Sequence, residues 1–249
     1  MKKIFFLLLP FTLILSTCEK KDNGPNNTDP NPDDPVNIPD SVLLYALINH
    51  GVDTNGDSLI SYSEARSVKS LIFGGCTPFW YPELGELADI TGIEAFVNLD
   101  TLISRNIIGI EKLDLTNLTK LKYLDIGGGV CGCCGEKKAL YPPGSMHNLN
   151  VTKCVLLEIL ICDRQSLTSL DVSNNPNLTY LDIGDNPNWE GNSITEFDLS
   201  NNINLTDITL SCIPTLNKVC VWTMPFPPAG VEVDTTGSPN VYFTTDCSK

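Results

Sequence analysis

One short stretch of the sequence carries oxygen donors at a spacing that suits a metal ion. The segment DTNGDSLISYSE, residues 53–64, places donors at its positions 1, 3, 5, 7, 9 and 12, and these are Asp53, Asn55, Asp57, the backbone carbonyl of Leu59, Ser61 and Glu64. A hard cation such as calcium takes roughly six to eight oxygen ligands, and a carboxylate at position 12 can bind it bidentately. The spacing therefore predicts a calcium site.

One position of this segment departs from the calcium-loop pattern. Ser58 stands at position 6, where the sharp turn normally requires glycine, and Gly56 lies two residues earlier. Two interpretations are open: calcium binds with the modest affinity of an extracellular module, or the segment is an acidic turn that fixes the backbone without metal. We expect calcium as a structural cofactor.

The flanks of the loop predict two helices. Asp40-Ser41 is a capping pair, and the apolar residues after it have helical spacing: Val42, Leu43, Ala46 and Leu47. A second short helix is expected from Ser63, and it runs without a linker into the first repeat at Val68. Residues 40–67 are thus predicted to form an EF-hand-like helical cap.

A short template recurs through the next part of the chain. Leu-x-x-Leu-x-Leu-x-x-Asn fits LTSLDVSNN from Leu167, LTYLDIGDN from Leu178 and, with Phe197 in a leucine position, ITEFDLSNN from Ile194. Apolar residues two apart lie on one face of a strand, whereas a helix would separate them, and Asn-Pro punctuation forces a turn. Two copies make one winding of about 21 or 22 residues, which lies in the range of leucine-rich solenoids.

These repeats resemble leucine-rich-repeat surface lipoproteins with internalin-like short repeats, of the kind found in Bacteroidota. The resemblance covers residues 68–224, and LADITGIEAFVNLDTL (87–102) is similar to the family's opening repeat. It implies a mostly β solenoid sealed by the helical cap, with residues 225–249 as a short C-terminal β cap. The same resemblance implies that calcium would hold the N-terminal cap rather than take part in chemistry.

The first residues predict export and lipidation. A cationic start and an apolar run that is too short to span a bilayer indicate a signal peptide over residues 1–17. The run ends in Leu-Ser-Thr-Cys, which resembles a bacterial lipobox and would leave Cys18 acylated. Residues 18–39 are rich in Pro, Asn and Asp and predict a disordered tether. We expect a protein anchored by lipid in the outer membrane and exposed at the cell surface.

The charge of the chain limits its partners. A formal net charge of −14 with no basic patch argues against nucleic acid and leaves cations, glycans or basic protein surfaces. Aromatic residues in the inserts suit a binding surface or the packing of a cap, and these are Trp80, Tyr81, Trp189 and Trp222. Export favours disulfides among the ten cysteines over a zinc site.

No recognisable catalytic pattern is present in the sequence. The chain has only two histidines, and neither stands beside a nucleophile or paired acids in a known arrangement. We therefore expect a non-enzymatic module that binds a host or microbial protein or glycan. The alternative is a structural envelope protein or an accessory subunit of an outer-membrane complex.

Overall fold

The computed structural model describes residues 29–73, 80–81, 85–105, 109–128, 144–185 and 191–248. The chain divides into two compact units, Met1–Pro30 and Asn31–Lys249, and every described helix and strand belongs to the second. Among the described residues, no helix has both the length and the apolar character needed to cross a membrane.

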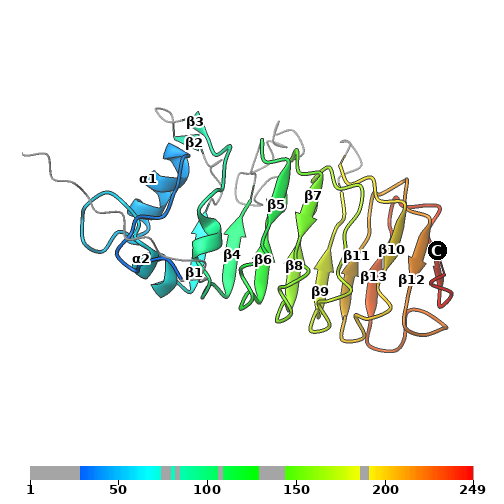
Figure 1. Cartoon of the computed structure of the whole chain (residues 1–249). Coiled ribbons are helices and arrows are strands. Elements are labelled where there is room, and N and C mark those ends of the chain that lie inside the picture. The colour runs from blue at the N-terminus through cyan, green and yellow to red at the C-terminus, as the bar shows by residue number, and fades with distance from the viewer. Residues whose placement is uncertain are drawn as a thin grey trace, which may run out of the picture. The chain divides into compact units, whose positions relative to one another are not determined.

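The strands of the second unit lie on two sides of the coil, and nearly all of them pair in parallel. One side is a seven-stranded sheet, made in this order by β1 (Ser70–Phe73), β4 (Thr101–Ser104), β6 (Tyr123–Asp125), β8 (Ile159–Ile161), β9 (Tyr180–Asp182), β11 (Asp207–Thr209) and β13 (Glu232–Asp234). The second side carries the pair β5 (Lys112–Asp114) and β7 (Asn148–Asn150), then the sheet of β10 (Glu196–Asp198), β12 (Lys218–Cys220) and β14 (Tyr242–Thr244). The chain therefore winds as a β-rich, solenoid-like coil (Figure 1).

The core lies between the two sides and is built from aligned apolar residues. Strand pairing brings one residue from each neighbouring strand into register: Leu102, Leu124, Leu160, Leu181 and Ile208. All of them are buried. Parallel strands lie about 4.8 Å apart, so these side chains stack into a continuous column. The prediction that apolar residues two apart face inward is confirmed for Leu113 with Leu115 and for Leu181 with Ile183, whereas Leu170 is only partly buried and lies in no strand.

Buried asparagines join one winding to the next at a turn. The Asn175 side-chain Nδ2 donates to the backbone oxygens of Val151, at 3.0 Å, and Cys154, at 2.8 Å. Asn202 Nδ2 donates in the same way to the oxygens of Val172 and Asn175, at 3.0 and 2.9 Å. Each of these oxygens also accepts a backbone hydrogen bond within its own turn, so the template asparagine adds a second donor that joins one winding to the next.

The C-terminal segment continues the coil instead of forming a separate cap. β13 pairs in parallel with β11, and β14 pairs in parallel with β12. The predicted solenoid boundary at residue 224 is therefore too early, because Val233 and Phe243 occupy the same register as the preceding inward residues. Both are only partly buried.

The N-terminal end is closed by two helices and an extended segment. α1 (Ser41–Asn49) and α2 (Tyr62–Ser67) flank the predicted calcium loop. The compact unit begins at Asn31, earlier than the boundary expected at residue 40. The backbone N–H of Val36 donates to the Ile60 oxygen at 2.7 Å, and the Val36 residue is 8% exposed. The last part of the predicted tether therefore pairs with the loop.

The remaining regular elements lie between β1 and β4. β2 (Trp80–Tyr81) and β3 (Gly85–Glu86) form a small antiparallel pair. The 3-10 helix η1 (Ile93–Ala95) comes next, in the opening repeat.

Candidate functional site

The predicted calcium loop is held by its own side chains. Asp53 accepts hydrogen bonds from the backbone N–H groups of Gly56, at 2.7 Å, and Ser58, at 3.0 Å. Asn55 Oδ1 accepts from Asp57 N–H, and Asp57 Oδ1 accepts from Leu59 N–H, each at 2.8 Å. The side chains at positions 1, 3 and 5 thus fix the loop backbone.

The non-glycine residue at position 6 adopts the backbone conformation that the turn requires. Ser58 has φ of 66° and Gly56 has φ of 77°. A left-handed conformation costs a non-glycine residue about 1 kcal/mol, and the Asp53 bond to Ser58 helps to hold it. The departure from the pattern therefore leaves the turn intact.

Glu64, the position-12 ligand, is engaged with the loop itself. Its Oε1 accepts from the backbone N–H and hydroxyl of Thr54, both at 2.8 Å, and its Oε2 accepts from the backbone N–H and hydroxyl of Ser61, at 2.9 and 2.8 Å. Burial raises its pKa, but these four bonds lower it more, to about 2. Glu64 is therefore a carboxylate at any physiological pH.

The residue types of the loop suit calcium, but its carboxylate oxygens do not converge on one point. Among the described residues, Asp198, Cys220 and Cys247 on the second side form a group of possible metal ligands. Their ligand atoms all lie within 4.8 Å of one another. Cys220 and Cys247 form a disulfide, which confirms a disulfide at the C-terminal end and removes both sulfurs as ligands. Calcium binding at Asp53–Glu64 would require the Glu64 carboxylate to turn from Thr54 and Ser61 toward the loop centre.

The outward face of the seven-stranded sheet is partly apolar. Tyr123, Ile159 and Tyr180 lie in register on adjacent strands and are only partly buried. Ile72 and Ile103 are in register on β1 and β4, and Ile72 is 49% exposed. Parallel sheets normally have both faces covered, so an apolar face that no other element of the described chain packs over is a candidate contact surface.

The face becomes acidic toward its C-terminal end. Asp207 and Glu232 follow Tyr180 in register, and Asp234 lies beside them. These residues line a shallow hollow of 310 Å³. No salt bridge within the described part of the chain involves any of these three carboxylates. The apolar rows and this acidic end together form the sheet face of the candidate site.

A partly buried ion pair lies on the same sheet, and the sequence did not reveal it. Arg105 Nε donates to Asp125 Oδ2 at 2.7 Å, and Asp125 is 4% exposed. Nearby Asp163 has a pKa raised to about 7, first by burial and then by the charge of Asp182, against the opposing effect of Arg105. The available signal was that Arg105 stands two residues after outward-facing Ile103 and so shares its face.

Among the predicted aromatic residues, the structure describes the side chain of Trp222 alone. Trp80 and Tyr81 form β2, whereas Trp189 lies outside the described residues, as does Cys18. Trp222 is partly buried and packs edge-on against Phe226 at 5.1 Å between ring centres. Trp222 therefore packs within the C-terminal part of the coil.

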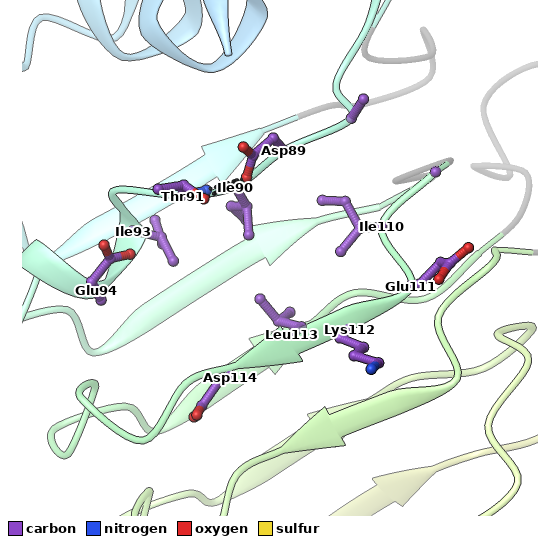
Figure 2. A pocket seen from close by; sticks show the side chains of 12 residues that line it. Asp89, Ile90, Thr91, Ile93, Glu94, Ile110, Glu111, Lys112, Leu113 and Asp114 are labelled. Carbon is purple, nitrogen blue, oxygen red and sulfur yellow. Dashed lines mark hydrogen bonds between the residues drawn. The ribbon is translucent and has the colours of Figure 1, made fainter. Parts of the chain in front are cut away.

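A second hollow lies beside β5, on the other side of the coil. Its volume is 380 Å³, and it separates β5 from residues 88–94 of the opening repeat. Figure 2 shows Ile90, Ile110 and Leu113 pointing into it, with Glu94, Glu111 and Lys112 around it. It thus combines an apolar floor with a charged rim.

Comparisons with known proteins relate this chain to solved structures alone. No family model matches it, and no curated protein does. Among the solved structures, internalin InlF of Listeria monocytogenes is 18% identical over 86% of this chain and 58% of its own, with a TM-score of 0.37. Internalin C2 of the same species is 17% identical over 88% of this chain and 100% of its own, also at 0.37.

The functional domain of Listeria monocytogenes InlJ, described as including a cysteine ladder, is 19% identical over 74% of this chain and 54% of its own, with a TM-score of 0.21. The chain thus spans little more than half the length of InlF and of the InlJ domain. The leucine-rich-repeat-like fold is assigned here from the strand registers and buried leucines of the chain itself.

Proposed function

We propose that this protein is a lipid-anchored, surface-exposed module that binds another protein through the outward face of its seven-stranded sheet. The observation that carries the proposal is the in-register row Tyr123, Ile159 and Tyr180, which continues into the acidic residues Asp207 and Glu232. Partly exposed aromatic rings beside charged groups are typical of the residues that dominate protein interfaces.

The experiment for this proposal is a binding screen with a matched variant pair. Purified full chain is applied to protein and glycan arrays, and each hit is repeated with the double variant Tyr123→Ser and Tyr180→Ser. The control is Tyr242→Ser on β14, a 54% exposed tyrosine on the second side. We expect protein hits that weaken at least tenfold with the double variant and not with the control. Hits only on glycans, or equal binding by both variants, would refute the sheet face as a protein-binding surface.

Anchoring at Cys18 is a separate part of the proposal. It is supported by the apolar leader that ends at the lipobox-like Leu-Ser-Thr-Cys sequence. Replacing Cys18 by Ala should move the protein from the outer-membrane fraction to the soluble fraction and abolish labelling by a radioactive fatty acid. A stoichiometric envelope partner in a pull-down from membranes would instead favour an accessory subunit of an outer-membrane complex.

Calcium is proposed as the ion that locks the N-terminal cap. The support is the oxygen set of residues 53–64 and the loop backbone that Asp53, Asn55 and Asp57 already hold. Its role would be structural, because α2 leads directly into β1 and the ion would fix the helices that cover the first winding.

A further inference from the structure

β5 has one edge whose backbone groups find no partner in the described chain. Within that chain β5 pairs with β7 alone. On the β7 side the Glu111 oxygen accepts from Asn148 N–H, and Leu115 N–H donates to the Asn150 oxygen. Backbone groups of alternate residues point to opposite edges of a strand, so those of Lys112 and Asp114 point away from β7.

No hydrogen bond to the backbone N–H or oxygen of Lys112 or Asp114 occurs within the described residues. The N–H groups of Ala88 and Asp89, on the opposite side of the hollow, cannot donate to this edge because both donate to Asp40 Oδ2 at 3.0 Å. An open strand edge of this kind is a template for a further strand.

The hollow beside this edge has the chemistry of a peptide site. Four largely buried apolar residues lie at its base: Ile90, Ile93, Ile110 and Leu113. Its rim carries four carboxylates against one ammonium group, from Asp89, Glu94, Glu111, Asp114 and Lys112. None of these five forms a salt bridge in the part of the chain that the structure describes.

We propose that the hollow binds an extended basic peptide segment of a partner protein, which adds as a strand to the free edge of β5. Main-chain bonds to Lys112 and Asp114 would supply affinity. Alternate side chains of the peptide would point to the floor or to the rim, so apolar residues would face Ile90 and Leu113 while Lys or Arg would face the carboxylates. This site is separate from the sheet face, and neither proposal depends on the other.

The test uses a fluorescent hexapeptide of alternating lysine and valine, measured by anisotropy with the full chain. Two comparison peptides are glutamate-valine and a lysine-valine peptide that is N-methylated at alternate amides. We expect saturable binding of the lysine-valine peptide below 1 mM (about −4 kcal/mol), with at least tenfold weaker binding of both comparison peptides.

Two protein variants separate the strand edge from simple charge attraction. Lys112→Pro removes one free N–H from the open edge while the bonds of β5 to β7 stay, since proline is tolerated at a strand edge that faces solvent. Its far-UV circular dichroism and melting temperature check the fold. Glu111→Gln tests the rim, and Asp207→Asn is its control, because β11 is paired on both edges.

We expect Lys112→Pro to weaken peptide binding at least tenfold, Glu111→Gln to weaken it severalfold at low salt, and Asp207→Asn to leave it unchanged. Absence of lysine-valine binding up to 1 mM would overturn the proposal, as would equal binding of the N-methylated peptide. If the protein forms concentration-dependent dimers that the Lys112→Pro variant does not form, a second copy of the chain occupies this edge. That result would also overturn the proposal.

Discussion

The carboxylate of Asp40 joins the N-terminal helices to the first repeat through the backbone N–H of Ala88. One oxygen of Asp40 caps α1 by accepting from Val42 and Leu43 N–H, at 2.8 and 3.1 Å. The other accepts from Ala88 N–H at 3.0 Å. A single side chain thus connects two segments that lie 48 residues apart.

Asp40→Ala should therefore cost more than the loss of an ordinary helix cap. Loss of the cap alone costs about 1 kcal/mol, and release of Ala88 and Asp89 N–H should bring the total to roughly 2 kcal/mol of unfolding free energy. Urea unfolding followed by circular dichroism measures it. Exposed Asp33→Ala is the control, and an Asp40→Ala loss no larger than the control's would contradict the connection.

Calcium should raise the melting temperature of the wild-type protein and not that of Asp57→Asn. Asparagine at 57 can still accept the hydrogen bond from Leu59 N–H, so this substitution removes ligand charge while preserving the loop. The measurement compares melting with millimolar calcium and with chelator, since an ion that binds only the folded state stabilises it. Glu64→Ala is unsuitable because it also removes the five hydrogen bonds that the Glu64 carboxylate accepts. Equal melting of the wild-type protein in both solutions would exclude a calcium lock.

Asp163 should make the folded state less stable as pH rises. Its ordinary pKa is 3.8, and burial beside Asp182 raises it to about 7. The folded protein therefore holds a proton that the unfolded chain releases, so this stabilisation is complete below about pH 4 and is lost as pH rises through about 7.

Asp163→Asn should remove that pH dependence. At pH 8 we expect the variant to be more stable than the wild-type protein by roughly 1–3 kcal/mol. This figure is smaller than the full pKa difference implies, because the Asp163 side chain is a fifth exposed and solvent screens its charge. At pH 4 the two proteins should melt alike. Melting scans in chelator at both pH values, with Asp207→Asn as control, test this, and a destabilised variant at pH 8 would contradict it.

Asn175→Ala should be among the costlier polar substitutions. It would remove two hydrogen bonds to the oxygens of Val151 and Cys154, which keep their backbone donors, at a cost of roughly 1–3 kcal/mol. Exposed Asn177, which donates one bond to Val155, is the matched control and should cost less than about 1 kcal/mol on replacement by Ala. Equal losses in denaturant unfolding would mean that the buried ladder does not stabilise the turns.

Several features could be predicted because their causes are local in sequence. Apolar residues two apart, such as Leu181 and Ile183, indicate an inward-facing strand because the side-chain period of a strand is two. Asp40 could be recognised as a helix cap because a cap bonds to N–H groups two or three residues away, whereas the second helix begins at Tyr62, one residue before the expected start, with Ser61 as its cap. The calcium-like loop was recognisable for the same reason, as its donors lie within one short segment.

The sequence by itself thus determined the repeat, the inward residues and the helices at its start. Only the tertiary structure decided that Val233 and Phe243 extend the coil, that Val36 pairs with Ile60 and that Arg105 meets Asp125. It also decided that one edge of β5 has no partner strand among the described residues. Each of these depends on which windings become neighbours in space. That choice is set by packing and strand register between residues far apart in the chain, which no local pattern encodes.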